Sequence, residues 1–166
     1  MSQTELSYEE LKQEIIEELR QHRTGVLATS DGNNVTARSV LLFSDGLTIY
    51  CFTDKDSRKF KQMSVNPNVS VAAGTLQIDG IATLKGHLLD EENVRFIELH
   101  KEQNPEYFKI TETFFFPRQS TRVIEITPKR IGKWMHGEGV DILNISTGKA
   151  HKIGWGDLDQ SPAYYE

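Results

Sequence analysis

The sequence has a single cysteine, Cys51, among its 166 residues. One thiol cannot form an intramolecular disulfide, and such scarcity fits the reducing interior of a cell. No run approaches the roughly 18 apolar residues that a transmembrane helix needs. The acidic, amphipathic N-terminus also lacks the basic and apolar segments of a signal peptide. We therefore expect a soluble, cytoplasmic protein with no membrane partner.

The sequence also lacks an excess of positive charge and the common motifs of side-chain catalysis. The formal net charge is −5, so nucleic acid is not an expected partner. The five histidines are scattered without the spacing of a metal site, and neither GxSxG nor GxGxxG occurs. Cys51 lies inside an apolar run and is interpreted as a small buried residue. No metal is expected, and a bound cofactor is the better-supported source of chemistry.

The apolar periodicity indicates a mainly β protein with peripheral helices. Ser7 and Glu10 match a capping box at the start of the first helix, and Pro105 marks the end of the last one. Helices are predicted at residues 7–22 and 57–63 and within the stretch 90–108, where the helix ends before Pro105. Strands are predicted at 24–30, 35–43, 47–53, 69–78, 81–90 and 121–135, and a hairpin around 146–149. The first three strands should form a meander. The whole predicts a single domain at 1–166, an antiparallel barrel with a core of about 19–135 and a C-terminal extension at 136–166.

The stretch TDKDSRKFKQMSVNPNVS, residues 53–70, combines hydroxyl and basic side chains where a strand passes into a helix. If Asp56 or Ser57 caps that helix, its first N–H groups point toward the space beside Thr53. Hydroxyls of Thr53 and Ser57, with the charge of Arg58 or Lys59, would complete a phosphate site. The alternative is a solvated loop.

Arg38 lies in the preceding strand, in the run TARSVLLF. In a meander this strand would pair with residues 47–53, so that Arg38 could approach Thr53 across the pair. Each charge alone is more typical of a solvated surface. Together they favour an anion site.

The segments ARSVLLF, IYCFTDKDSRKFKQMSVNPNVSVAA and IDGIATLKG resemble the pyridoxamine 5'-phosphate oxidase-like family of FMN-binding split barrels, over about residues 19–135. The resemblance implies a six-stranded antiparallel Greek-key split β-barrel. It also implies a homodimer with FMN at the subunit interface, which passes electrons to or from a small-molecule substrate.

The same resemblance implies roles for single residues. Arg38 and Lys59 would pair with the FMN phosphate, with Ser57 and Arg58 beside them, and Thr53 would contact the phosphate or the ribityl chain.

The remaining implied contacts concern the flavin ring. Ser39 and Val40 would lie along the isoalloxazine, and Gln77 would reach it from the partner subunit. Trp134 would close the pocket, or would instead pack in the core or the interface.

The chain departs from true pyridoxamine phosphate oxidases at its end, where GWGDLDQSPAYYE replaces a Trp…Arg-Leu-x-Pro segment. It looks more like the general-stress or flavin-reductase-like members. Two alternatives stay open: a non-catalytic flavin- or haem-binding module of the stress response, and a reductase that uses deazaflavin F420. The apolar cluster FFFP at residues 114–117 is expected either in the dimer contact or in the core.

Overall fold

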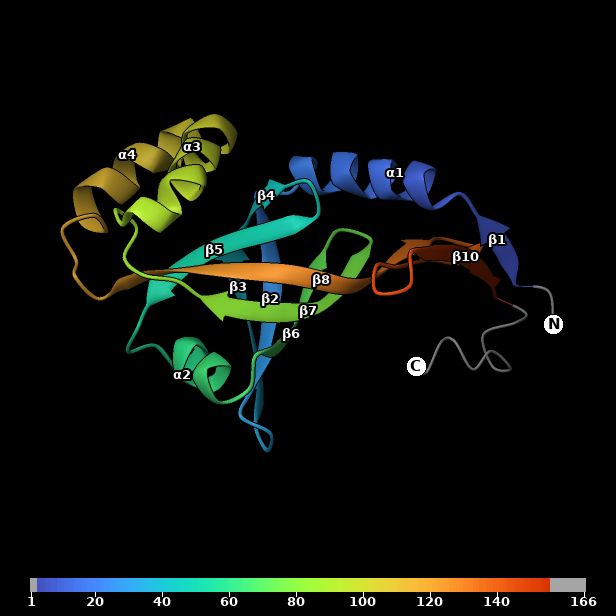
Figure 1. Cartoon of the computed structure of the whole chain (residues 1–166), viewed down its shortest axis with the longest axis horizontal. Coiled ribbons are helices and arrows are strands. Elements are labelled where there is room, and N and C mark those ends of the chain that lie inside the picture. The colour runs from blue at the N-terminus through green and yellow to red at the C-terminus, as the bar shows by residue number, and fades with distance from the viewer. Residues whose placement is uncertain (1–2, 156–166) are drawn as a thin grey trace.

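The strands curl into an antiparallel barrel, with helices along its sides and a narrow extension at one end (Figure 1). The computed structural model describes residues 3–155. In chain order the elements are β1 (Thr4–Leu6), α1 (Tyr8–Gln21), β2 (Thr24–Ser30), β3 (Val35–Leu41), β4 (Phe43–Asp45), β5 (Thr48–Asp54), α2 (Arg58–Val65), β6 (Asn68–Ala73), β7 (Leu76–Leu84), η1 (Glu91–Asn93), α3 (Val94–Gln103), α4 (Pro105–Phe114), β8 (Thr121–Met135), β9 (Gly139–Asn144) and β10 (Lys149–Gly154). The expected mainly β architecture with peripheral helices is confirmed.

The long strand β8 divides the sheet in two. It pairs with β7 along its length, while its first part also pairs with β5 and its last part with β9. The change of partner falls near Pro128, which has no N–H to donate to a neighbouring strand. Here Gly80 lies so close to β8 that an added Cβ would stand 2.7 Å from the carbonyl oxygen of Thr127. A register shift between Asp79 and Gly80 accommodates this approach. Pro128 therefore marks a change of partner inside one continuous strand.

The predicted three-strand meander is wrong. Within residues 3–155, β3 pairs with β2 alone, whereas β5 pairs with β4 and β8. The short strand β4 lies between β3 and β5 in the chain, and β5 turns back to pair with it. β3 and β5 therefore do not pair with each other. Arg38 consequently lies opposite Leu27 of β2 and not opposite a residue of β5.

Two other boundaries differ from the sequence prediction. The turn implied between the predicted strands 69–78 and 81–90 lies instead around Gly74, whose positive φ of 57° suits a tight turn. Asp79 and Gly80 lie inside β7, opposite a bulge at Lys129 of β8. Pro105 follows the end of α3 as expected, but it also begins a further helix, α4, as its first-turn residue. Because of α4, the expected loop before β8 is largely helical.

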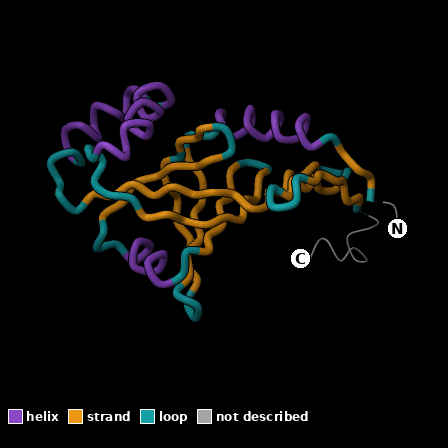
Figure 2. Tube along the Cα trace, in the orientation of Figure 1, coloured by secondary structure: helices purple, strands orange, loops and turns teal. Residues whose placement is uncertain are grey.

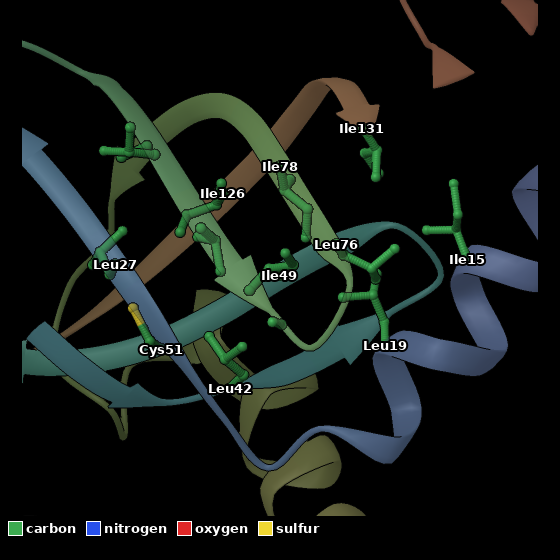
Figure 3. Packing of buried hydrophobic residues seen from close by; sticks show 14 of the residues in the cluster. Ile15, Leu19, Leu27, Leu42, Ile49, Cys51, Leu76, Ile78, Ile126 and Ile131 are labelled. Atoms are coloured by element: carbon green, nitrogen blue, oxygen red, sulfur yellow. The ribbon is translucent and has the colours of Figure 1, made fainter. Parts of the chain in front are cut away.

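The two larger hydrophobic clusters hold the helices against the barrel. Leu11, Ile15 and Leu19 form the buried stripe of α1, and Figure 3 shows the last two projecting toward Leu76 of β7 in the main core. A second, aromatic cluster lies where α3 and α4 cover the end of the barrel. The predicted Phe cluster is divided: Phe114 is exposed, and the next two phenylalanines are half-buried against the aromatic cluster.

The C-terminal extension continues the sheet beyond the barrel. The predicted hairpin around residues 146–149 is confirmed as β9 and β10, and the unpredicted strand β1 adds to its outer edge (Figure 2). Residues 156–166, including the DLDQSPAYYE part of the divergent ending, lie outside the described residues. Within the described part of the chain, no helix is both long enough and apolar enough to cross a lipid bilayer.

Candidate functional site

The guanidinium of Arg38 is held by the strand next to its own. Its Nη1 donates to the carbonyl oxygen of Leu27 at 3.2 Å and to Thr29 Oγ1 at 2.7 Å. Its Nη2 donates to the hydroxyl of Thr36, two residues earlier on β3. Three acceptors from two paired strands fix the plane of the group, which lies half-buried at the edge of the sheet.

Gln62 of α2 locks the two threonines in place. Its Oε1 accepts from Thr29 Oγ1 at 2.6 Å and from Thr36 Oγ1 at 2.7 Å, while its Nε2 donates to the carbonyl oxygen of Asn34 at 3.2 Å. Gln62 is only 4% exposed. Each hydroxyl donates to Gln62 and accepts from Arg38, so α2 and the arginine are linked through one polar network.

The N-terminus of α2 lies at the same place. Ser57, rather than Asp56, is the N-cap, and its Oγ accepts from the N–H of Phe60 at 3.4 Å. The hydroxyls of Ser57 and the buried Thr53 are 3.0 Å apart. Arg58 and Lys59 follow as the first helical residues, the former exposed and the latter half-buried. The strand-to-helix passage therefore presents two hydroxyls, two cations and the positive end of a helix dipole.

The cations of this cluster interact unfavourably with one another. Burial lowers the pKa of the Arg38 guanidinium, and the positive charge of Arg58 lowers it further. Burial also lowers the pKa of the Lys59 ammonium, and the charge of Arg38 adds to that effect. Among residues 3–155, no carboxylate forms an ion pair with any of the three. An anion bound between them would relieve this repulsion.

The structure thus brings Arg38, Arg58 and Lys59 together, but by a different route from the one expected. Arg38 reaches the cluster because α2 packs on the β2–β3 edge, not through a β3–β5 pair. Sequence reasoning missed Thr29, Thr36 and Gln62, since no spacing signals a bond between residues about 26 to 33 positions apart.

Two of the residues expected at the flavin ring, Ser39 and Gln77, lie in one row on the outer face of the sheet. Ser39, Val26, Ala72 and Gln77 stand side by side in one row across β3, β2, β6 and β7, and all four are exposed. Three interstrand steps of about 4.8 Å place Gln77 about 14 Å from Ser39. Within one chain, Gln77 therefore does not meet the cation cluster.

Trp134 lies on the same outer face as Gln77, and the two line one hollow of about 180 Å³. Val40 is half-buried beside the main core. Of the nine residues expected at one site, five lie in or beside the cation cluster, namely Arg38, Thr53, Ser57, Arg58 and Lys59, and Gln77 and Trp134 line a separate hollow. Ser39 and Val40 belong to neither group.

Other chemistry has little support in the described residues. Cys51 is buried, and burial raises the pKa of its thiol to about 12, so the thiol stays protonated. Between residues 3 and 155, no three histidine, cysteine or acidic side chains are grouped as metal ligands would be.

Comparisons with known proteins agree with this fold. The family model described as pyridoxamine 5'-phosphate oxidase matches residues 11–135. General stress protein 26 of Bacillus subtilis (strain 168) is 35% identical over 69 residues, which are 42% of this chain and 49% of that protein. The chain thus spans about half the length of this curated relative.

Solved structures show the same architecture. A Listeria innocua protein named as a pyridoxamine 5'-phosphate oxidase superposes with a TM-score of 0.58 at 30% identity, over 73% of this chain and 95% of that one. HutZ of Vibrio cholerae, described as a heme storage protein, has a TM-score of 0.58 at 19% identity, over 69% and 88% of the two chains. Because the family model covers well over half of the sequence, the chain belongs to the pyridoxamine 5'-phosphate oxidase-like family of split barrels.

Proposed function

We propose that the protein binds FMN and works as an oxidoreductase that transfers electrons between the flavin and a small molecule. The observation that carries the proposal is the cluster of Arg38, Arg58 and Lys59 around the N-terminus of α2, without a carboxylate partner among the described residues. The family includes FMN-binding oxidoreductases and haem-binding proteins. Cations that repel one another, with no carboxylate ion-paired to them among the described residues, favour a ligand with a phosphate group.

The residues present fit the phosphate of FMN. The guanidinium of Arg38 is oriented by three acceptors and offers charge-assisted bonds in a fixed plane, while Lys59 supplies a more adaptable charge. Hydroxyls of Thr53 and Ser57 can donate to the remaining phosphate oxygens or to the ribityl chain. FMN, when bound, would supply the redox chemistry, and the protein would position the ring and exclude water from it.

The outer face of the sheet supports the proposal of a homodimer with FMN at the interface. Val26 is 44% exposed there, and Ala37, Ser39 and Ala72 are exposed on the same face. A second copy on this face would cover its apolar residues and bring its own Gln77 and Trp134 toward the ring, next to Ser39 and Val40. The mass in solution tests this directly, since a monomer that binds FMN tightly would contradict it.

The experiment for the function is a titration of purified protein with FMN, followed by flavin absorbance and fluorescence, and then anaerobic mixing with NADH or NADPH. Saturable binding and bleaching of the flavin band support an FMN oxidoreductase. Tight binding without reduction would instead indicate a non-catalytic flavin module. Parallel titrations with F420 and with hemin distinguish the remaining alternatives. A Soret shift with hemin and no response to FMN would overturn the proposal.

A further inference from the structure

Asp54, the last residue of β5, joins the passage from β5 into α2 to the start of β8. Its Oδ2 accepts a hydrogen bond from Ser120 Oγ at 2.5 Å, across 66 positions of the sequence. Its Oδ1 accepts from the backbone N–H of Asp56 at 2.8 Å. An ionised carboxylate has two acceptor oxygens and no donor, so Asp54 matches these two donors, one on each side.

Backbone bonds connect the same two segments. The N–H of Lys55 donates to the carbonyl oxygen of Ser120 at 2.8 Å, and Asp54 stands opposite Thr121 at the end of the β5–β8 pair. On the other side, the N–H of Ser57 donates to the carbonyl oxygen of Asp54 at 3.0 Å, which closes a turn over residues 54–57. The position of Ser57 therefore depends on how Asp54 is held.

Ser57 is the residue through which this turn reaches the cation cluster. Its hydroxyl caps α2 and lies 3.0 Å from the hydroxyl of Thr53. Arg58 and Lys59 are the first residues of the same helix. A shift of the turn would therefore displace the hydroxyl of Ser57 together with the first N–H groups and the two cations of α2.

The segment that carries Ser120 is itself firmly held, so it can serve as a fixed support. Thr121 is 2% exposed, and its N–H and Oγ1 donate to the carbonyl oxygens of Arg118 and Phe115, each at 3.1 Å. The ring of Phe115 packs edge-on against Phe52 of β5, with the centroids 5.2 Å apart. The end of α4 thereby braces, through Ser120, the turn that begins α2.

The charge of Asp54 is unfavourable for an anion site, because a carboxylate beside the cations repels an anionic ligand. Its charge partly opposes the lowering of the Lys59 pKa by burial and by Arg38. The Ser120 hydroxyl and then the Asp56 N–H lower the pKa of Asp54 itself, so the carboxylate stays ionised at neutral pH. A group that weakens the attraction for an anion needs another role at this place, and its two hydrogen bonds supply one.

We propose that Asp54 and Ser120 are positioning residues for the bound anion. By holding residues 54–57 against β8, this pair, the clamp, keeps the two hydroxyls of the cluster where a phosphate group can accept from them. The proposal deepens the proposed function and rests on it for the identity of the anion as the phosphate of FMN. Neither residue of the clamp is assigned a contact with the ligand. Removing the clamp should weaken anion binding even where it removes a repulsive charge.

Inorganic phosphate is the first probe, because it tests the anion site without FMN. The urea midpoint of the full-length protein is measured at increasing phosphate and, at equal ionic strength, in chloride. Phosphate that binds the folded protein alone raises the midpoint, and the concentration dependence gives a dissociation constant. The general stabilising effect of phosphate does not saturate and is common to all variants, so only the saturable increment counts. FMN affinity is measured in parallel by fluorescence titration.

Two substitutions that remove the same charge separate the clamp from electrostatics. Asp54→Ala should weaken phosphate and FMN by roughly three- to tenfold, because the turn loses both of its side-chain bonds. Asp56→Ala is the matched control two residues on, and it keeps the N–H that Asp54 accepts, so its affinities should equal or exceed those of the parent protein. Asp54→Asn should stay within about twofold of the parent, since its amide retains an acceptor for this N–H and a donor for the Ser120 hydroxyl.

Substitutions at Ser120 test the other half of the clamp. Ser120→Ala should weaken both ligands by roughly threefold, and Ser120→Thr, which keeps the hydroxyl, should restore the affinity. The double variant Asp54→Ala/Ser120→Ala should bind no more weakly than Asp54→Ala alone, because both changes break the same bond. The Ser120 variants decide the matter if Asp54→Ala fails to fold.

Several outcomes would overturn the inference. A purely structural role would lower the urea midpoint of the variants and leave their dissociation constants unchanged. Equal gains of affinity in Asp54→Ala and Asp56→Ala would show that only charge matters. No saturable effect of phosphate or FMN on the parent protein would reject the inference and the proposed function together. Phosphate binding that depends on the clamp in a protein that does not bind FMN would reject the proposed function and support the positioning role.

Discussion

Replacing Gln62 by Leu tests whether the buried network behind Arg38 builds the cation cluster. Gln62 accepts from the hydroxyls of Thr29 and Thr36 at 2.6 and 2.7 Å. Leu is of similar size but offers no acceptor. Thr29 is 1% exposed, so its hydroxyl would lose its acceptor out of reach of water, whereas the half-buried Thr36 can turn toward solvent.

One buried unsatisfied donor costs about 1–3 kcal/mol, and the other lost bonds add less because water can replace them. We expect Gln62→Leu to lower the free energy of unfolding by about 2–3 kcal/mol in urea titrations. FMN affinity should fall by roughly three- to tenfold. The hydroxyls of Thr29 and Thr36 remain, but without Gln62 they are no longer held in place and orient Arg38 less firmly.

Gln62→Glu separates the two effects. It keeps acceptors for both threonines but places a carboxylate beside Arg38, so FMN affinity should fall more steeply than stability. Unfolding free energies of Gln62→Leu within about 0.5 kcal/mol of the parent protein, together with unchanged FMN affinity, would refute the reasoning.

Further predictions concern the cation cluster, His100 of α3 and the close contact between β7 and β8. Arg38→Ala should weaken FMN by roughly ten- to hundredfold, or about 1.5–3 kcal/mol, and Lys59→Ala by less, as measured by fluorescence titration. Lys61→Ala is the control, and an equal loss there would indicate diffuse charge rather than a site. Burial lowers the pKa of His100 below its ordinary value of 6.5. As the pH falls, His100 is therefore protonated in the unfolded chain before it is protonated in the folded protein. The contribution of His100 to stability should be complete above about pH 6.5 and should fall as the pH drops toward the folded-state pKa. Between pH 7.5 and 5, the urea midpoint of His100→Phe should decline less than that of the parent protein. Equal declines in the two proteins would contradict this. Gly80→Ala should lower the unfolding free energy by roughly 1–3 kcal/mol, because its Cβ would stand 2.7 Å from a carbonyl oxygen of β8. An unchanged urea midpoint for Gly80→Ala would show that β7 and β8 can move apart at this point with little loss of free energy.

The sequence by itself determined the features that depend on neighbouring residues. Ser7 and Ser57 cap their helices with bonds that span three residues, and both are recognisable from local pattern. The hairpin of β9 and β10 and the alternation of buried and exposed residues along the strands are local in the same way. The hydroxyl and basic residues at the start of α2 were recognised because strand, cap and helix follow one another in the chain.

Only the tertiary structure decided which strands are partners. Arg38 was expected beside Thr53 because their strands are close in sequence, but β4 returns on β5 and leaves β3 paired with β2. Strand alternation fixes which face a residue occupies and not which strand lies next to it.

The same limit applies to the two groups of site residues. Gln62 reaches Thr29 across 33 positions, and the hollow lined by Gln77 and Trp134 needs walls from three strands. Such contacts arise from the packing of α2 on the barrel edge and from the exchange of β8 between β5 and β9. These contacts join residues that are far apart in the sequence and that no local pattern links. The sequence alone therefore does not predict them, and only the folded chain shows them.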